Sequence, residues 1–86
     1  MTLTPVKYLV DGTSVNGRGG IYVEQRAQRD GSILWCIVTS FSEVFNRDLQ
    51  WEWEPMPSSR TDEFIARTRF TFEEACELVK QINLGL

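Results

Sequence analysis

Residues 21–39 read IYVEQRAQRDGSILWCIVT, two runs rich in β-branched and aromatic residues on either side of Asp30-Gly31. Asp-Gly between two such runs is a strong hairpin signal, because both turn residues must tolerate a positive φ angle. A two-residue turn there pairs Ala27 with Leu34, Gln25 with Cys36 and Val23 with Val38. We therefore predict an antiparallel hairpin in which these six residues form the core face.

The opposite face of this hairpin is half apolar and half charged. In the predicted register it shows Ile33, Trp35 and Ile37 beside Tyr22, Glu24, Arg26 and Gln28. Because large contiguous apolar patches are uncommon on soluble monomers, we expect this face to be covered by the protein's own tail, a second copy or a partner. Tyr22 and Trp35 are therefore candidate partner-binding residues.

Two further strands and one loop are predicted around the hairpin. Residues 6–10 are β-rich and stop at Asp11-Gly12, which indicates an edge or near-edge strand. Residues 13–20 are rich in glycine and are expected to form a flexible loop, with Arg18 as its contact residue for a partner. Residues 49–54 alternate strictly and predict a half-buried strand ended by prolines. Its two faces carry Leu49, Trp51 and Trp53 on one side and Gln50, Glu52 and Glu54 on the other.

The end of the chain is predicted to be helical. Residues 61–70 combine an alternating apolar pattern with a charge order that suits the dipole of a short helix, and we favour the helix. Thr71 and Glu74 form a capping box, in which the two residues exchange hydrogen bonds at a helix start. Gly85 is expected to end this helix. Its apolar face carries Phe72, Ala75, Cys76, Val79 and Ile82.

Together these segments predict a single small α+β domain over residues 1–86. Its sheet has three to four antiparallel strands, and the C-terminal helix packs on one face. The longest uninterrupted apolar run, Ile33 to Val38, is too short to cross a membrane. The N-terminus shows no secretion signal, so we expect a cytoplasmic protein without membrane contact.

The residue types that most catalytic and metal sites need are scarce. The sequence has no histidine, and Cys36 and Cys76 do not form a Cys-x-x-Cys pair, so we expect both to be reduced core thiols. Glu52 and Glu54 have a spacing similar to that of paired carboxylates in glycoside hydrolysis, but they fall on the exposed face of an alternating strand. We therefore expect no catalytic residues, no metal and no cofactor, and a protein that is not an enzyme.

The acidic residues are unevenly placed along the chain. The net charge of −3 provides no general attraction to nucleic acid or anionic lipid. Residues 43–63 hold six acidic and two basic residues, a sum of −4. This stretch is either ordinary solvated surface or an acidic face that docks on a basic groove of another protein. In the second case Glu52 and Glu54 are the contact residues.

Residues 51–60, followed by Phe64, Arg67, Arg69-Phe70 and Glu73-Glu74-Ala75, resemble short bacteriophage and prophage proteins of unassigned function. The resemblance covers about half of the chain and transfers no functional residue. It implies a viral protein in the bacterial host cytoplasm, similar to anti-CRISPR proteins and other host-takeover inhibitors, which occupy a site on a larger machine.

We therefore hypothesise a non-enzymatic binding protein that inhibits a host protein or ribonucleoprotein complex of defence or nucleic-acid processing. We expect no direct nucleic-acid binding by such an inhibitor. The alternative is a small structural or regulatory phage protein that acts through self-association or nucleic-acid contact. A homodimer is compatible with either hypothesis.

Overall fold

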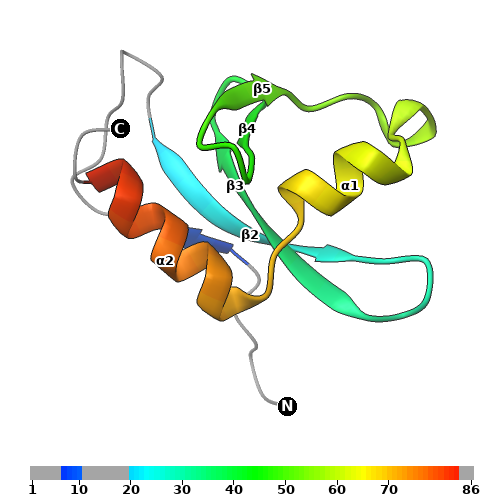
Figure 1. Cartoon of the computed structure of the whole chain (residues 1–86), viewed down its shortest axis with the longest axis horizontal. Helices are drawn as coiled ribbons and strands as arrows, with labels where there is room; N and C mark the ends of the chain where they lie inside the picture. Colours follow the sequence, from blue (N-terminus) through cyan, green and yellow to red (C-terminus); the bar gives the residue numbers. More distant parts are fainter. Residues whose placement is uncertain (1–6, 11–19, 84–86) are drawn as a thin grey trace.

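The computed structural model describes residues 7–10 and 20–83 of the chain (Figure 1). These residues form a five-stranded antiparallel sheet and two α-helices, which confirms the predicted α+β class. The strands pair in chain order: β1 (Lys7–Leu9), β2 (Ile21–Ala27), β3 (Ile33–Thr39), β4 (Glu43–Phe45) and β5 (Trp51–Trp53). A 3-10 turn, η1 (Pro57–Ser59), precedes α1 (Asp62–Thr68) and α2 (Phe72–Asn83).

The β2–β3 hairpin is present, but the predicted register is wrong by one residue. Val23 lies opposite Ile37, and Gln25 lies opposite Trp35. The turn contains three residues rather than two: the Gly31 amide donates to the Gln28 carbonyl at 3.0 Å, and Gly31 has a φ angle of 86°. This is a type I turn followed by a residue in the left-handed region.

The side chain of Asp30 stabilises this turn, because its carboxylate accepts hydrogen bonds from the amide and the hydroxyl of Ser32. A shift of one residue moves every side chain of a strand to the other face of the sheet. Trp35 and Ile37 therefore lie on the same face as Val23, and not beside Tyr22 as the predicted register requires.

The same turn connects the next two pairs of strands. Ser42 donates to the Thr39 carbonyl at 3.3 Å, and Leu49 donates to the Asn46 carbonyl at 3.0 Å. Both donors have a φ angle of 62°, the left-handed conformation in which a residue with a Cβ is strained. At the first turn position, the side chains of Thr39 and Asn46 each accept two backbone amides and hold the turn in place.

Strand β4 is the element that the sequence patterns do not predict. With three residues it is too short to show a period of alternation. Val44 pairs with Val38 of β3 and with Glu52 of β5, so β4 joins the hairpin to the edge strand. The sheet therefore has one strand more than the upper limit of the prediction.

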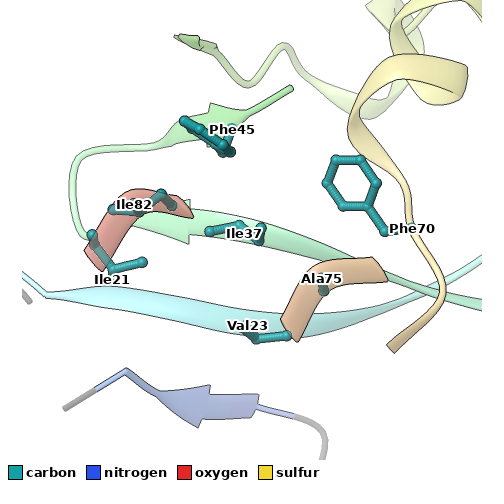
Figure 2. Close-up of a cluster of buried hydrophobic side chains, with 7 residues drawn as sticks. All are labelled: Ile21, Val23, Ile37, Phe45, Phe70, Ala75 and Ile82. Atoms are coloured by element: carbon teal, nitrogen blue, oxygen red, sulfur yellow. The ribbon is translucent and has the colours of Figure 1, made fainter. Parts of the chain in front are cut away.

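The two helices cover opposite faces of the sheet. In Figure 2, Ala75 and Ile82 of α2 lie over Ile21, Val23 and Ile37, and these five belong to one buried cluster together with Phe45 and Phe70. We call this side the α2 face. On the opposite side, the α1 face, a second cluster contains Phe64, Cys36, Val38 and Val44. Between the helices, Phe70 and Trp35 exchange backbone hydrogen bonds of 2.7 and 2.8 Å in the plane of the sheet.

A threonine side chain caps the start of each helix, and only the cap of α2 was predicted. The Thr61 hydroxyl accepts from the Phe64 amide at 3.1 Å. The helical interpretation of residues 61–70 is confirmed for Asp62–Thr68, whereas Phe70 forms the β-bridge to Trp35. The capping box is confirmed, because Thr71 donates to the Glu74 carboxylate at 2.9 Å and Glu74 donates to the Thr71 hydroxyl at 3.1 Å. Gly85 lies outside the described residues. Neither helix of the described part of the chain is long and apolar enough to span a membrane.

Candidate partner-binding surface

Four apolar side chains of the α2 face form one exposed surface beside the start of α2. We call Tyr8, Ile33, Trp35 and Phe72 the aromatic patch. Tyr8 is 41% exposed and Phe72 is 37% exposed, while Trp35 is half-buried. Ile33 lies two residues before Trp35 on β3, so its side chain points to the same face. The patch therefore combines three rings and one aliphatic side chain.

The three rings of the patch pack against one another. The ring centroids lie 5.9 Å apart for Tyr8 and Trp35, 5.5 Å for Tyr8 and Phe72, and 5.0 Å for Trp35 and Phe72. These distances fall within the range in which aromatic pairs attract each other. Each ring is held in place by the other two. Binding of a partner here therefore restricts few side-chain rotamers that are still free in the unbound protein.

Three distant segments bring these rings together. Tyr8 lies opposite Val23 on β2, and β2 in turn pairs with β3, which carries Trp35. The bridge between Phe70 and Trp35 fixes the start of α2 two residues later, so Phe72 reaches the Trp35 ring. Sequence reasoning finds Trp35 but misses Tyr8 and Phe72. Phe72 follows the capping Thr71 directly, which places it at an accessible helix start, and this signal is readable in the sequence.

The predicted contact residues do not form one site. Tyr22 lies on the α1 face, half-buried against the cluster of Cys36 and Phe64, so the prediction that it shares a face with Trp35 is wrong. The ammonium group of Lys7 lies 4.4 Å from the centre of the Tyr22 ring. Arg18 lies outside the described residues.

Glu52 is held on the α1 face by an arginine of α1. Arg67 donates from Nε and Nη2 to the two Glu52 oxygens, both at 2.7 Å, and Asn46 donates to the same carboxylate at 2.8 Å. The hydrogen bonds from Arg67 are the main reason that the pKa of Glu52 is lowered. The expectation of a freely solvated Glu52 is therefore wrong.

Glu54 is more deeply enclosed, since its side chain is only 10% exposed. Arg69 donates to both of its oxygens at 3.1 and 3.2 Å, and Nε of Arg60 lies 3.1 Å from one of them. Two basic groups thus compensate the charge of Glu54 inside the chain. Since both glutamates are paired in this way, the acidic docking face expected from the sequence is not built from freely exposed carboxylates.

A second apolar surface lies at the β5 edge of the sheet. Phe41, Trp53 and Met56, which we call the β5 patch, are all more than half exposed. Trp53 is 68% exposed, so the prediction of a half-buried strand face is wrong at this residue. The reason is that β5 is an edge strand and only Trp51 packs against the main core. Leu49, which was predicted on the same strand face, lies in the turn before β5 and has a left-handed backbone conformation.

The two cysteines are free thiols in different surroundings. Cys36 is fully buried on β3, and burial raises its pKa to about 11. Cys76 on α2 is half-buried. The expected core position is therefore confirmed for Cys36 and only partly reached by Cys76. Among residues 7–10 and 20–83, no group of three or more cysteine or acidic side chains could hold a metal ion.

Comparison with known proteins does not extend this description. No family model, curated protein or solved structure matches the chain. A functional proposal therefore rests on the geometry of the chain and on the expectations drawn from its sequence.

Proposed function

We propose that the protein is a non-enzymatic binding protein that recognises a partner protein through the aromatic patch. The observation that carries this proposal is the packing of Tyr8, Trp35 and Phe72, whose centroids lie 5.0 to 5.9 Å apart while Tyr8 and Phe72 stay about 40% exposed. Aromatic residues are enriched in the cores of protein interfaces, and tryptophan and tyrosine are frequent hot spots.

The aromatic patch suits this role better than the β5 patch. Its rings hold one another in place, and Trp35 is additionally fixed by two backbone hydrogen bonds to Phe70. In the β5 patch, Phe41 lies within the β3–β4 turn and Met56 lies between two prolines outside the sheet, and among the described residues neither Phe41 nor Trp53 packs against another ring. Binding through rigid side chains loses less conformational entropy than binding through flexible ones.

The more specific form of the proposal comes from the resemblance of residues 51–60 to short phage proteins. We propose that the partner is a host protein or ribonucleoprotein complex of defence or nucleic-acid processing in the bacterial cytoplasm. Occupying a surface of such a complex requires a binding patch and no catalytic group. In the alternative, a structural or regulatory phage protein, the same patch would join two copies of this chain.

The experiment is affinity capture from bacterial lysate followed by mass spectrometry, with two matched phenylalanine variants. Phe72 belongs to the aromatic patch and Phe41 to the β5 patch, and both side chains are exposed. We expect Phe72→Ala to lose the captured protein and Phe41→Ala to keep it. Equal capture by Phe72→Ala and the wild type would contradict the proposal.

Molecular mass in solution tests the alternative with the same variants. A wild-type dimer that Phe72→Ala converts to a monomer would favour self-association through the patch. A monomer at all concentrations would exclude it.

A further inference from the structure

A cleft of about 470 Å³ opens on the α1 side, between the tip of the β2–β3 hairpin and the segment that leads into α1. These two parts of the chain lie at the same end of the molecule, on the right in Figure 1. One wall is formed by residues 27–30, and the other by Pro57, Arg60, Asp62 and Ile65. Two arginines, Arg29 and Arg60, thus line the same cleft from different walls.

Within the described residues, the Arg60 guanidinium donates a hydrogen bond from Nε only. Its Nε donates to the Pro55 carbonyl at 3.1 Å and lies 3.1 Å from a Glu54 oxygen. Within the described part of the chain, Nη1 and Nη2 donate no hydrogen bond, although the Arg60 side chain is only 22% exposed. A guanidinium has five N–H donors, so Nη1 and Nη2 of Arg60 keep donors that no group of the described residues uses. These two nitrogens of Arg60 are therefore available to an acceptor from outside the chain.

Arg29 differs from the other basic residues that the structure describes. It is the only one without a carboxylate in ion-pair distance. The seven paired residues are Lys7, Arg26, Arg47, Arg60, Arg67, Arg69 and Lys80. Arg29 is exposed in the hairpin turn at the mouth of the cleft, so its charge is available to a ligand.

Two aspartates balance the formal charge of the two arginines that line the cleft. Asp30 lines it from the hairpin turn, and Asp62 lines it from the first turn of α1. Hydrogen bonds from Ser32 lower the pKa of Asp30, so Asp30 is ionised at neutral pH. These carboxylates repel a doubly charged anion such as phosphate more than a singly charged one. Ala27, Pro57 and Ile65 add apolar walls that suit a short aliphatic chain.

From this combination we propose that the cleft binds a single carboxylate on a short aliphatic chain, with Arg60 as its hydrogen-bond donor and Arg29 as a second positive charge. Arginine suits this ligand because its planar group matches the two carboxylate oxygens. The carboxylate has two sources, a small free acid or a glutamate side chain of a partner peptide. The inference does not depend on the aromatic patch.

The test is a titration of the ¹⁵N-labelled full chain, followed by NMR. The probes are sodium propionate for the free acid, N-acetylglutamate amide for the peptide side chain, and inorganic phosphate, each compared with sodium chloride at equal ionic strength. We expect saturable shifts at Arg29, Arg60 and Ile65 with both carboxylates, and weaker binding of phosphate. Tighter binding of N-acetylglutamate amide than of propionate would identify a peptide as the source, and the reverse order a free acid. Absence of saturable shifts, or phosphate bound as tightly as propionate, would overturn the proposal.

Three arginine variants provide the specificity control. Arg29→Gln and Arg60→Gln are expected to weaken propionate binding by about fivefold or more, since each removes a charge-assisted contact. Arg47→Gln is the matched control, because Arg47 is exposed, pairs with Glu74 and does not line this cleft. Unchanged affinity in Arg29→Gln would contradict the proposal even if Arg60→Gln fails to fold. Equal weakening in Arg47→Gln would show nonspecific attraction instead.

Discussion

Arg69 donates from Nη2 to both carboxylate oxygens of Glu54, at 3.1 and 3.2 Å, although the Arg69 side chain is only 1% exposed. Nη1 of Arg69 also donates to the Thr68 hydroxyl at 3.2 Å. This pair ties the end of β5 to the segment between α1 and α2. Glu52 and Glu54 of the acidic stretch therefore form ion pairs within the chain, and their charges stabilise the fold.

Glu54→Gln should destabilise the protein strongly, because it leaves the buried Arg69 without its charge partner. Removing one member of a buried ion pair typically costs about 3–5 kcal/mol of unfolding free energy. Glu63→Gln is the control, since Glu63 is exposed and forms no ion pair within the described residues. Urea unfolding measures both variants. A Glu54→Gln variant as stable as Glu63→Gln would contradict the structural role of the pair.

The stability of the fold should decrease as the pH falls below the ordinary pKa of a glutamate side chain. The folded chain lowers the pKa of Glu52 through Arg67, and that of Glu74 mainly through the Thr71 amide. A lowered folded pKa gives stability that is present above the unfolded pKa and is lost as the pH falls through the folded pKa. We expect the melting temperature to decrease as the pH falls below about 4.5, where the glutamates of the unfolded chain become protonated.

Glu52→Gln provides the comparison for this pH dependence. The difference in melting temperature between this variant and the wild type should be largest near pH 7 and shrink in acid. A difference that stays constant from pH 7 to pH 3 would show that the Glu52 charge does not contribute.

The left-handed turn positions Gly31 and Ser42 should differ in how substitution changes the free energy of unfolding. Gly31→Ala places a Cβ at a φ angle of 86°, where it meets no atom within 4 Å, so its cost is backbone strain alone. We expect a loss of about 1 kcal/mol of unfolding free energy. Ser42→Gly removes a Cβ at a φ angle of 62° and should not destabilise the chain. A Gly31→Ala variant with unchanged stability would contradict the three-residue turn.

Cys36 should resist thiol reagents in the folded protein, because it is fully buried and its pKa is raised to about 11. The thiolate is the reactive form, and little of it exists at pH 8. Half-buried Cys76 should react faster, and both cysteines should react after unfolding. Mass spectrometry of labelled peptides distinguishes the two. Labelling of Cys36 at the rate of Cys76 would contradict its position in the core.

Local chemistry explains which elements were predictable. The capping box of Thr71 and Glu74 and the hairpin around Gly31 depend on neighbouring residues, and the structure contains both. Turn length is harder to read, because Asp-Gly fits both a two-residue turn and the three-residue turn. Here Asp30 selects the longer turn by accepting two hydrogen bonds from Ser32.

The candidate site was only partly predictable because its contacts are distant in sequence. Trp35 is identified, but its neighbours Tyr8 and Phe72 depend on the sheet order and on the bridge to Phe70. The partner of Glu52 likewise comes from α1, fifteen residues later. An alternating pattern in the sequence shows that two side chains of a strand lie on the same face of the sheet. It does not show which face a helix later in the chain covers.

The proposed recognition through the aromatic patch is tested most directly by the affinity of the purified chain for the protein that it captures. Calorimetry would compare the wild type with Phe72→Ala and Phe41→Ala. We expect Phe72→Ala to weaken binding by about tenfold or more, as for a residue at an interface hot spot, and Phe41→Ala to bind like the wild type. Wild-type affinity in Phe72→Ala, or a loss confined to Phe41→Ala, would contradict binding through Tyr8, Trp35 and Phe72.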